Sequence, residues 1–182
     1  MKKTVLILSV FFCSFGGNAQ QIVRLNPNEI ETNETPQAVA YNFVMSIINE
    51  DYDMTRGLIT PYFQGMIDRW AYEAGVPEEE IMSGKTVERL FSGEYFMNDI
   101  MGMRPVIKKG YDLVITDSFE EDLSRYFSDD ENPYEGYRAY SVSFTCADAK
   151  DNIYDGKYGE YDITTRVVLL YQHGRWMVLF FK

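Results

Sequence analysis

The chain has 182 residues, which is enough for one globular domain whose hydrophobic core needs no metal ion or disulfide to be stable. It carries 28 acidic and 17 basic residues, and the net charge of −11 repels phosphate backbones and anionic lipid headgroups. Nucleic acid is therefore excluded as an expected partner.

The first 19 residues have the layout of a secretory signal peptide. An apolar stretch from Val5 to Phe15 follows two lysines, and Gly17 and Ala19 are small residues three and one positions before a cleavage site. This stretch is shorter than the ~20 apolar residues of a permanent membrane anchor, and no later stretch is long and apolar enough. Lipidation of Cys13 would need a small residue before it, and Phe12 is large. We therefore expect cleavage after Ala19, export to the periplasm or the extracellular space, and no membrane insertion.

A single domain is predicted over residues 35–182, after a lead-in segment, residues 20–34, that has neither helical nor alternating periodicity. Thr35 followed by Pro36 is typical of a helix N-cap with proline at the first helical position. The apolar residues that follow share one helical face: Ala40, Phe43, Val44, Ile47 and Ile48. The domain is therefore expected to open with an amphipathic helix.

Further helices are predicted up to about residue 100. A short one covers about 53–59, and Thr60 with Pro61 repeats the capping signal and starts a third helix that ends at Gly75. Its apolar face is formed by Phe63, Met66, Ile67, Trp70, Ala71 and Ala74. A fourth helical stretch is expected within 78–100.

From Pro105 onward the hydrophobic period changes to two, which predicts a sheet in the second half of the chain. The expected strands cover 111–119, 137–146, 161–172 and 175–182. The second of these alternates cleanly, with Tyr140, Val142, Phe144 and Cys146 on one face. After cleavage of the signal peptide Cys146 is the one cysteine left, so no internal disulfide can form, and we expect it to be a small buried side chain.

The last two strands are predicted to form a hairpin around His173, the one histidine of the sequence. If His173 and Gly174 make a two-residue loop, Gln172 pairs with Arg175. Counting outward then pairs Tyr171 with Trp176, Leu169 with Val178 and Val167 with Phe180 on one face, and Leu170 with Met177 and Val168 with Leu179 on the other. Such loops need a positive φ, which glycine adopts freely and histidine tolerates. We expect His173 to be an exposed corner and not a catalyst, because proton transfer needs a sheltered pocket.

Helices first and long antiparallel strands afterwards indicate an α+β fold, with the N-terminal helices packed on one face of a curved, mainly antiparallel sheet. The segments "TPQAVAYNFVMSIINEDYDMTRGLITPYF" (35–63) and "YQHGRWMVLFFK" (171–182) carry a family resemblance. The chain resembles the cystatin-like cone fold of the nuclear transport factor two superfamily, and more narrowly its small secreted members from Gram-negative bacteria. The resemblance covers about 35–65 and 137–182, and it does not extend to 76–103 or 120–136.

The resemblance leaves function open, because this superfamily hosts isomerases, dehydratases and epoxide hydrolases beside members without known catalysis. No spacing singles out a catalytic pair, so no catalytic residue and no cofactor is predicted. Tyr140, Tyr171 and Trp176 are the candidates to line a ligand cavity, with plain core packing as the alternative. The leading hypothesis is a secreted or periplasmic non-catalytic binding module for a small apolar ligand or a protein partner. The alternatives are an isomerase- or dehydratase-type enzyme that uses a carboxylate and a tyrosine in the cone, and a structural dimer or assembly protein.

Two acidic loops, 118–136 and 148–162, raise the question of calcium, which binds clustered oxygen ligands. The second loop departs from the EF-hand pattern, since Ile153 occupies the third position counted from Asp151, where an oxygen ligand belongs. We expect both loops to be solvated and predict no metal site.

Both faces of the final hairpin are apolar, and the N-terminal helices can cover only one of them. The other face could be covered by a second copy of the chain, or by 76–103 and 120–136 folding back over it. The sequence-based expectation is a homodimer through the C-terminal sheet.

Overall fold

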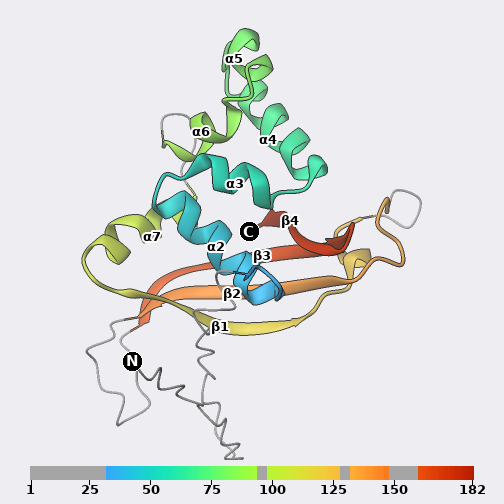
Figure 1. Cartoon of the computed structure of the whole chain (residues 1–182). Helices are drawn as coiled ribbons and strands as arrows, with labels where there is room; N and C mark the ends of the chain where they lie inside the picture. The colour runs from blue at the N-terminus through green and yellow to red at the C-terminus, as the bar shows by residue number, and fades with distance from the viewer. Residues whose placement is uncertain (1–31, 94–97, 128–131, 148–159) are drawn as a thin grey trace, which may run out of the picture.

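The computed structural model describes residues 32–93, 98–127, 132–147 and 160–182, and it has the predicted α+β architecture (Figure 1). The helices are α2 (Pro36–Ile48), α3 (Tyr52–Leu58), α4 (Pro61–Glu73), α5 (Glu78–Met82), α6 (Thr86–Phe91) and α7 (Asp99–Lys108). They are followed by an antiparallel sheet of β1 (Asp112–Glu120), β2 (Ala139–Ala147), β3 (Glu160–Gln172) and β4 (Arg175–Phe181), paired in that order. The predicted signal peptide and most of the lead-in segment lie outside the described residues. Within the described ranges, no helix has the length and apolar character needed to cross a bilayer.

The predicted helix starts are confirmed. The hydroxyl of Thr35 accepts a hydrogen bond from the backbone N–H of Ala38 at 3.2 Å at the start of α2, and the hydroxyl of Thr60 accepts one from Phe63 at 3.1 Å at the start of α4. At the other end of α4, Gly75 has a φ of 82°, which a glycine adopts at little cost. The region 78–100 holds two short helices, α5 and α6, and the beginning of α7.

The expectation that the helical part ends before Pro105 is wrong, because α7 contains this proline and continues to Lys108. A proline inside a helix removes one backbone hydrogen bond and crowds the carbonyl four residues earlier. Two features outweigh this cost. Asn98 caps the helix, and the apolar side of α7 is buried against the rest of the domain through Ile100, Met101, Met103 and Val106.

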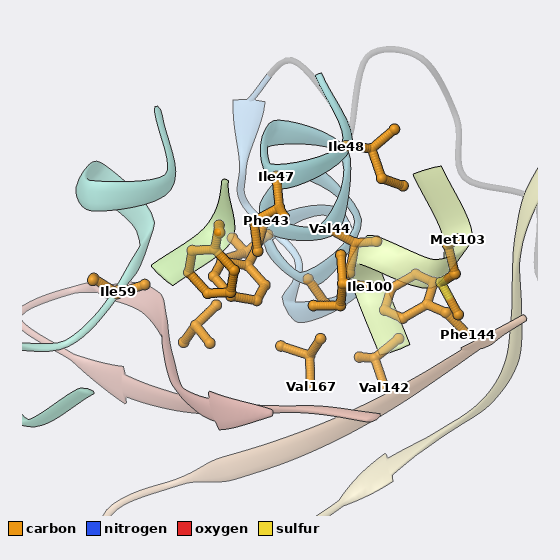
Figure 2. Close-up of a cluster of buried hydrophobic side chains, with 14 of the residues drawn as sticks. Phe43, Val44, Ile47, Ile48, Ile59, Ile100, Met103, Val142, Phe144 and Val167 are labelled. Atoms are coloured by element: carbon orange, nitrogen blue, oxygen red, sulfur yellow. The ribbon is translucent and has the colours of Figure 1, made fainter. Parts of the chain in front are cut away.

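The inner face of the sheet, which faces the helices, carries the main core. The predicted alternation of β2 is confirmed, since Val142, Phe144 and Cys146 are all buried there. Figure 2 shows side chains of α2 and α7 meeting those of the sheet, with Ile100 facing Val142 and Val167. Four phenylalanine rings from four different elements also meet in this layer, with contacting centroids 5.9 to 6.4 Å apart: Phe43, Phe63, Phe91 and Phe181. Buried side chains therefore fill the centre of the layer between the helices and the sheet.

The predicted hairpin register is confirmed for the four pairs nearest the turn, from Gln172–Arg175 to Leu169–Val178. Beyond them a β-bulge leaves Leu179 unpaired, so that Val168 pairs with Phe180 and Val167 with Phe181. The sequence-based pairing was one residue out at these positions. As a result Phe181 points into the inner core and Phe180 points to the outer face, the reverse of the prediction.

The outer face of the sheet carries a second buried cluster. Its members are at most 5% exposed: Leu123, Ala139, Val168, Leu170 and Leu179. Residues 121–127 and 132–137, hereafter the covering segment, lie over this face and contribute Tyr126, Phe127 and Tyr134 to the packing. The hairpin face that the helices cannot reach is thus covered by the same chain, which is one of the two predicted solutions. The homodimer stays a prediction.

Candidate functional site

His173 lies where the hairpin turns and is exposed. Its φ is 52° and that of Gly174 is 80°, the pair of positive values that a two-residue turn of this kind requires. The interpretation of His173 as a structural corner is confirmed.

The three aromatic residues proposed from the sequence lie together near the turn of this hairpin. Tyr140, Tyr171 and Trp176 come from β2, β3 and β4, three strands that are neighbours in the sheet. The ring centroid of Trp176 lies 5.1 Å from that of Tyr171 and 6.1 Å from that of Tyr140, both with an edge-to-face arrangement. The indole is 8% exposed and the ring of Tyr171 is 37% exposed, so the cluster is buried at Trp176 and open at Tyr171.

Arg138 completes the cluster and was missed by the sequence reasoning. Its guanidinium carbon lies 5.8 Å from the ring centroid of Tyr171 and 5.6 Å from that of Trp176. Its backbone carbonyl accepts a hydrogen bond from the N–H of Tyr171 at 2.8 Å, just before β2 begins. The pairing of β2 with β3 brings Arg138 to this cluster. No local pattern in the sequence specifies that register, so Arg138 could not be predicted.

These side chains line an open groove of about 400 Å³. Its opposite wall is the start of α2, formed by Glu34, Thr35, Pro36 and Gln37. The amide nitrogen of Gln37 lies 3.4 Å from the hydroxyl of Tyr140, which ties this wall to the aromatic one. We call this space the Trp176 groove. A second cavity of about 350 Å³ shares Trp176 and is lined further by Val39, Met54, Leu58 and Arg175, among others.

The described groups with raised pKa values lie outside the Trp176 groove. Burial raises the pKa of the Cys146 thiol to about 11, and burial followed by the nearby carboxylate of Asp112 raises the pKa of Tyr41. Burial also raises the pKa of Tyr134. None of Cys146, Tyr41 and Tyr134 lines the Trp176 groove. The groove offers ring faces, the amide of Gln37, the guanidinium of Arg138 and the carboxylate of Glu34, and such a mixture of apolar and polar groups is suited to binding a ligand.

The covering segment contains a buried carboxylate, Glu121, whose side chain is 1% exposed. One of its oxygens accepts hydrogen bonds from the hydroxyls of Ser141 at 2.5 Å and Tyr126 at 3.1 Å. The other has no hydrogen-bond partner, and the nearest cation is Arg125 at 3.9 Å. Glu121 thereby ties the covering segment to β2 on the outer face, away from the Trp176 groove.

No group of three or more histidine, cysteine, aspartate or glutamate side chains that could hold a metal ion occurs in the part of the chain that the structure describes. Most of the acidic loop 148–162, and residues 128–131 of the loop 118–136, lie outside that part. The calcium alternative for these loops is therefore not addressed by the described residues.

No family model matches the chain, and neither a curated protein nor a solved structure was found that is similar to it. What the fold and the groove define is a class: an α+β domain with helices on one face of an antiparallel sheet and an open aromatic groove beside the final hairpin. The resemblance to the nuclear transport factor two superfamily remains a prediction from the sequence.

Proposed function

We propose that this protein is an exported, non-catalytic binding module that holds a small ligand with a flat, largely apolar face in the Trp176 groove. The observation that carries the proposal is the convergence of Tyr140, Tyr171 and Trp176 on one open groove. Aromatic rings that are rigidly held and partly open to solvent offer apolar contact area at little cost in conformational entropy. Gln37 and Arg138 add polar groups that can orient a ligand.

The alternatives receive less support from the described residues. An isomerase or dehydratase of the expected kind would need a carboxylate facing a cavity between helices and sheet. The centre of that layer is filled by apolar side chains, and the buried carboxylate Glu121 lies on the outer face. Glu34, which lines the Trp176 groove, is exposed and not enclosed in a cavity. A dimer through the C-terminal sheet would need an uncovered outer face, whereas Leu170 and Leu179 are fully buried beneath the covering segment.

The experiment that tests the proposal is a fluorescence titration in a Trp70→Phe background. The chain has two tryptophans, so this substitution leaves Trp176 as the one indole reporter. The probe is phenylacetamide, a neutral molecule with one aromatic ring, and a probe this small is expected to bind with a Kd of about 1 mM. We expect a saturable change in Trp176 emission.

Two further variants locate the binding. Tyr171→Ala should weaken it several-fold, because the more open ring of the groove is lost. The matched control is Tyr72→Ala, which removes a tyrosine ring that is 70% exposed on α4 and lines no part of the groove. An emission change that does not saturate, or one that Tyr72→Ala and Tyr171→Ala weaken equally, contradicts the proposal.

A further inference from the structure

We infer that the ligand of the Trp176 groove is a small flat-ring carboxylate, with the carboxylate bound by Arg138. This inference rests on the proposed function and adds the charge of the ligand to it.

Arg138 has N–H donors available for a ligand. Its guanidinium is placed by its two ring contacts, and no carboxylate pairs with it among the described residues. A guanidinium beside ring faces keeps its N–H donors in its own plane, and a carboxylate can accept two of them side by side.

Aromatic rings lie beside these donors. The faces that hold the guanidinium belong to Tyr171 and Trp176, so a ring attached to the carboxylate comes to lie against the same aromatic wall. A ligand that carries a carboxylate and a ring therefore uses both features at once. A purely apolar ligand would leave the guanidinium donors to water, and a purely ionic one would leave the rings unused.

The charged residues that border the groove limit the charge of the ligand. Glu34 lines the opposite wall and likewise has no ion-pair partner among the described residues. With one cation and one anion bordering the groove, a ligand with a single negative charge can sit near Arg138 and away from Glu34. A second negative charge on the ligand would find no second cation among the described residues that line the groove, and it would face Glu34 instead. The groove thus favours a monocarboxylate.

The test compares phenylacetate with phenylacetamide, which has the same shape without the charge, in the Trp70→Phe background. We expect phenylacetate to bind about tenfold more tightly, the size of effect that one charge-assisted hydrogen-bonded pair produces in a partly exposed site. Arg138→Gln should weaken phenylacetate about tenfold and leave phenylacetamide within about twofold. Glu34→Gln should strengthen phenylacetate a few-fold, since it removes the opposing charge.

Arg175→Gln is the matched control, because this arginine lines the neighbouring cavity on the other side of Trp176. It should leave the ratio of the two affinities unchanged. Equal affinities for acid and amide in the parent protein, or a preference for the acid that survives Arg138→Gln, would overturn the inference while the proposed function stands. If neither probe changes the emission of Trp176, the proposed function itself fails, and this outcome is distinct from a loss of the acid preference alone.

Discussion

Replacing Leu170 with alanine tests whether the outer face of the sheet is internal core. The side chain is fully buried beneath the covering segment. The substitution removes three carbon atoms, which at about 0.8 kcal/mol each corresponds to a loss of about 2.4 kcal/mol of transfer free energy. If the neighbours do not close the gap, the residual cavity adds about 24 cal/mol per Å³, so that the total approaches ~4 kcal/mol. Leu169→Ala, the adjacent residue on the inner face and equally buried, should cost a similar amount.

The assay is equilibrium urea unfolding, followed by circular dichroism at two protein concentrations that differ about fifty-fold. Met82→Ala serves as the exposed control, since Met82 is 81% exposed on α5, and it should change the free energy of unfolding by less than about 0.5 kcal/mol. If the outer face were instead an interface between two copies, the unfolding midpoint would rise with protein concentration. A cost below about 1 kcal/mol for Leu170→Ala alongside a full cost for Leu169→Ala would refute the two-faced core.

Three further outcomes follow from other parts of the fold. His173→Asn should leave the free energy of unfolding unchanged or raise it slightly in urea titrations, because asparagine before glycine favours this turn; a loss of more than about 1 kcal/mol would contradict the turn assignment. Arg104→Ala should lower it by about 2 kcal/mol in the same assay, because Arg104 donates hydrogen bonds to the backbone carbonyls of Ile47 at 2.7 Å and Phe91 at 3.2 Å at the ends of two helices. The pKa of Cys146, raised from 9.0 to about 11 in the folded state, means that this thiol holds its proton more tightly in the folded state, so its contribution to stability should be constant below about pH 9 and be lost between about 9 and 11. Cys146→Ala should remove this part of the pH dependence, and an unchanged pH profile would refute the assignment.

The parts of the fold that the sequence predicted correctly are those that local chemistry specifies. Thr35 and Thr60 predict the helix starts because the threonine hydroxyl accepts a hydrogen bond from a backbone N–H in the first turn, which has no partner within the helix. His173 and Gly174 likewise predict the hairpin, because the turn depends only on the positive φ values of these two adjacent residues. Each of these signals needs no information from distant parts of the chain.

The parts that were missed depend on partners far away in the sequence. The helix through Pro105 survives because its apolar side is buried by other elements, and a proline judged alone indicates the end of a helix. The bulge at Leu179 follows from how β4 pairs with β3, and it exchanges the faces of Phe180 and Phe181 although both are equally apolar. A hydrophobic pattern cannot distinguish two phenylalanines in a row, so the inward residue could be identified only from the packed structure.

The candidate site lies between these two cases. Tyr171 and Trp176 were proposed because aromatic side chains can line ligand cavities, and their predicted pairing across the hairpin is observed. The opposite wall of the groove begins at Thr35, where the capping bond fixes the start of α2. Both walls are therefore held by short-range constraints, a capped helix start on one side and a tight turn on the other. A groove built in this way exists before any ligand arrives, so contact with its rings is not offset by a cost of ordering its walls. This preorganisation makes the open groove suited to a small ligand, whereas the centre of the layer between helices and sheet is occupied by the protein's own side chains.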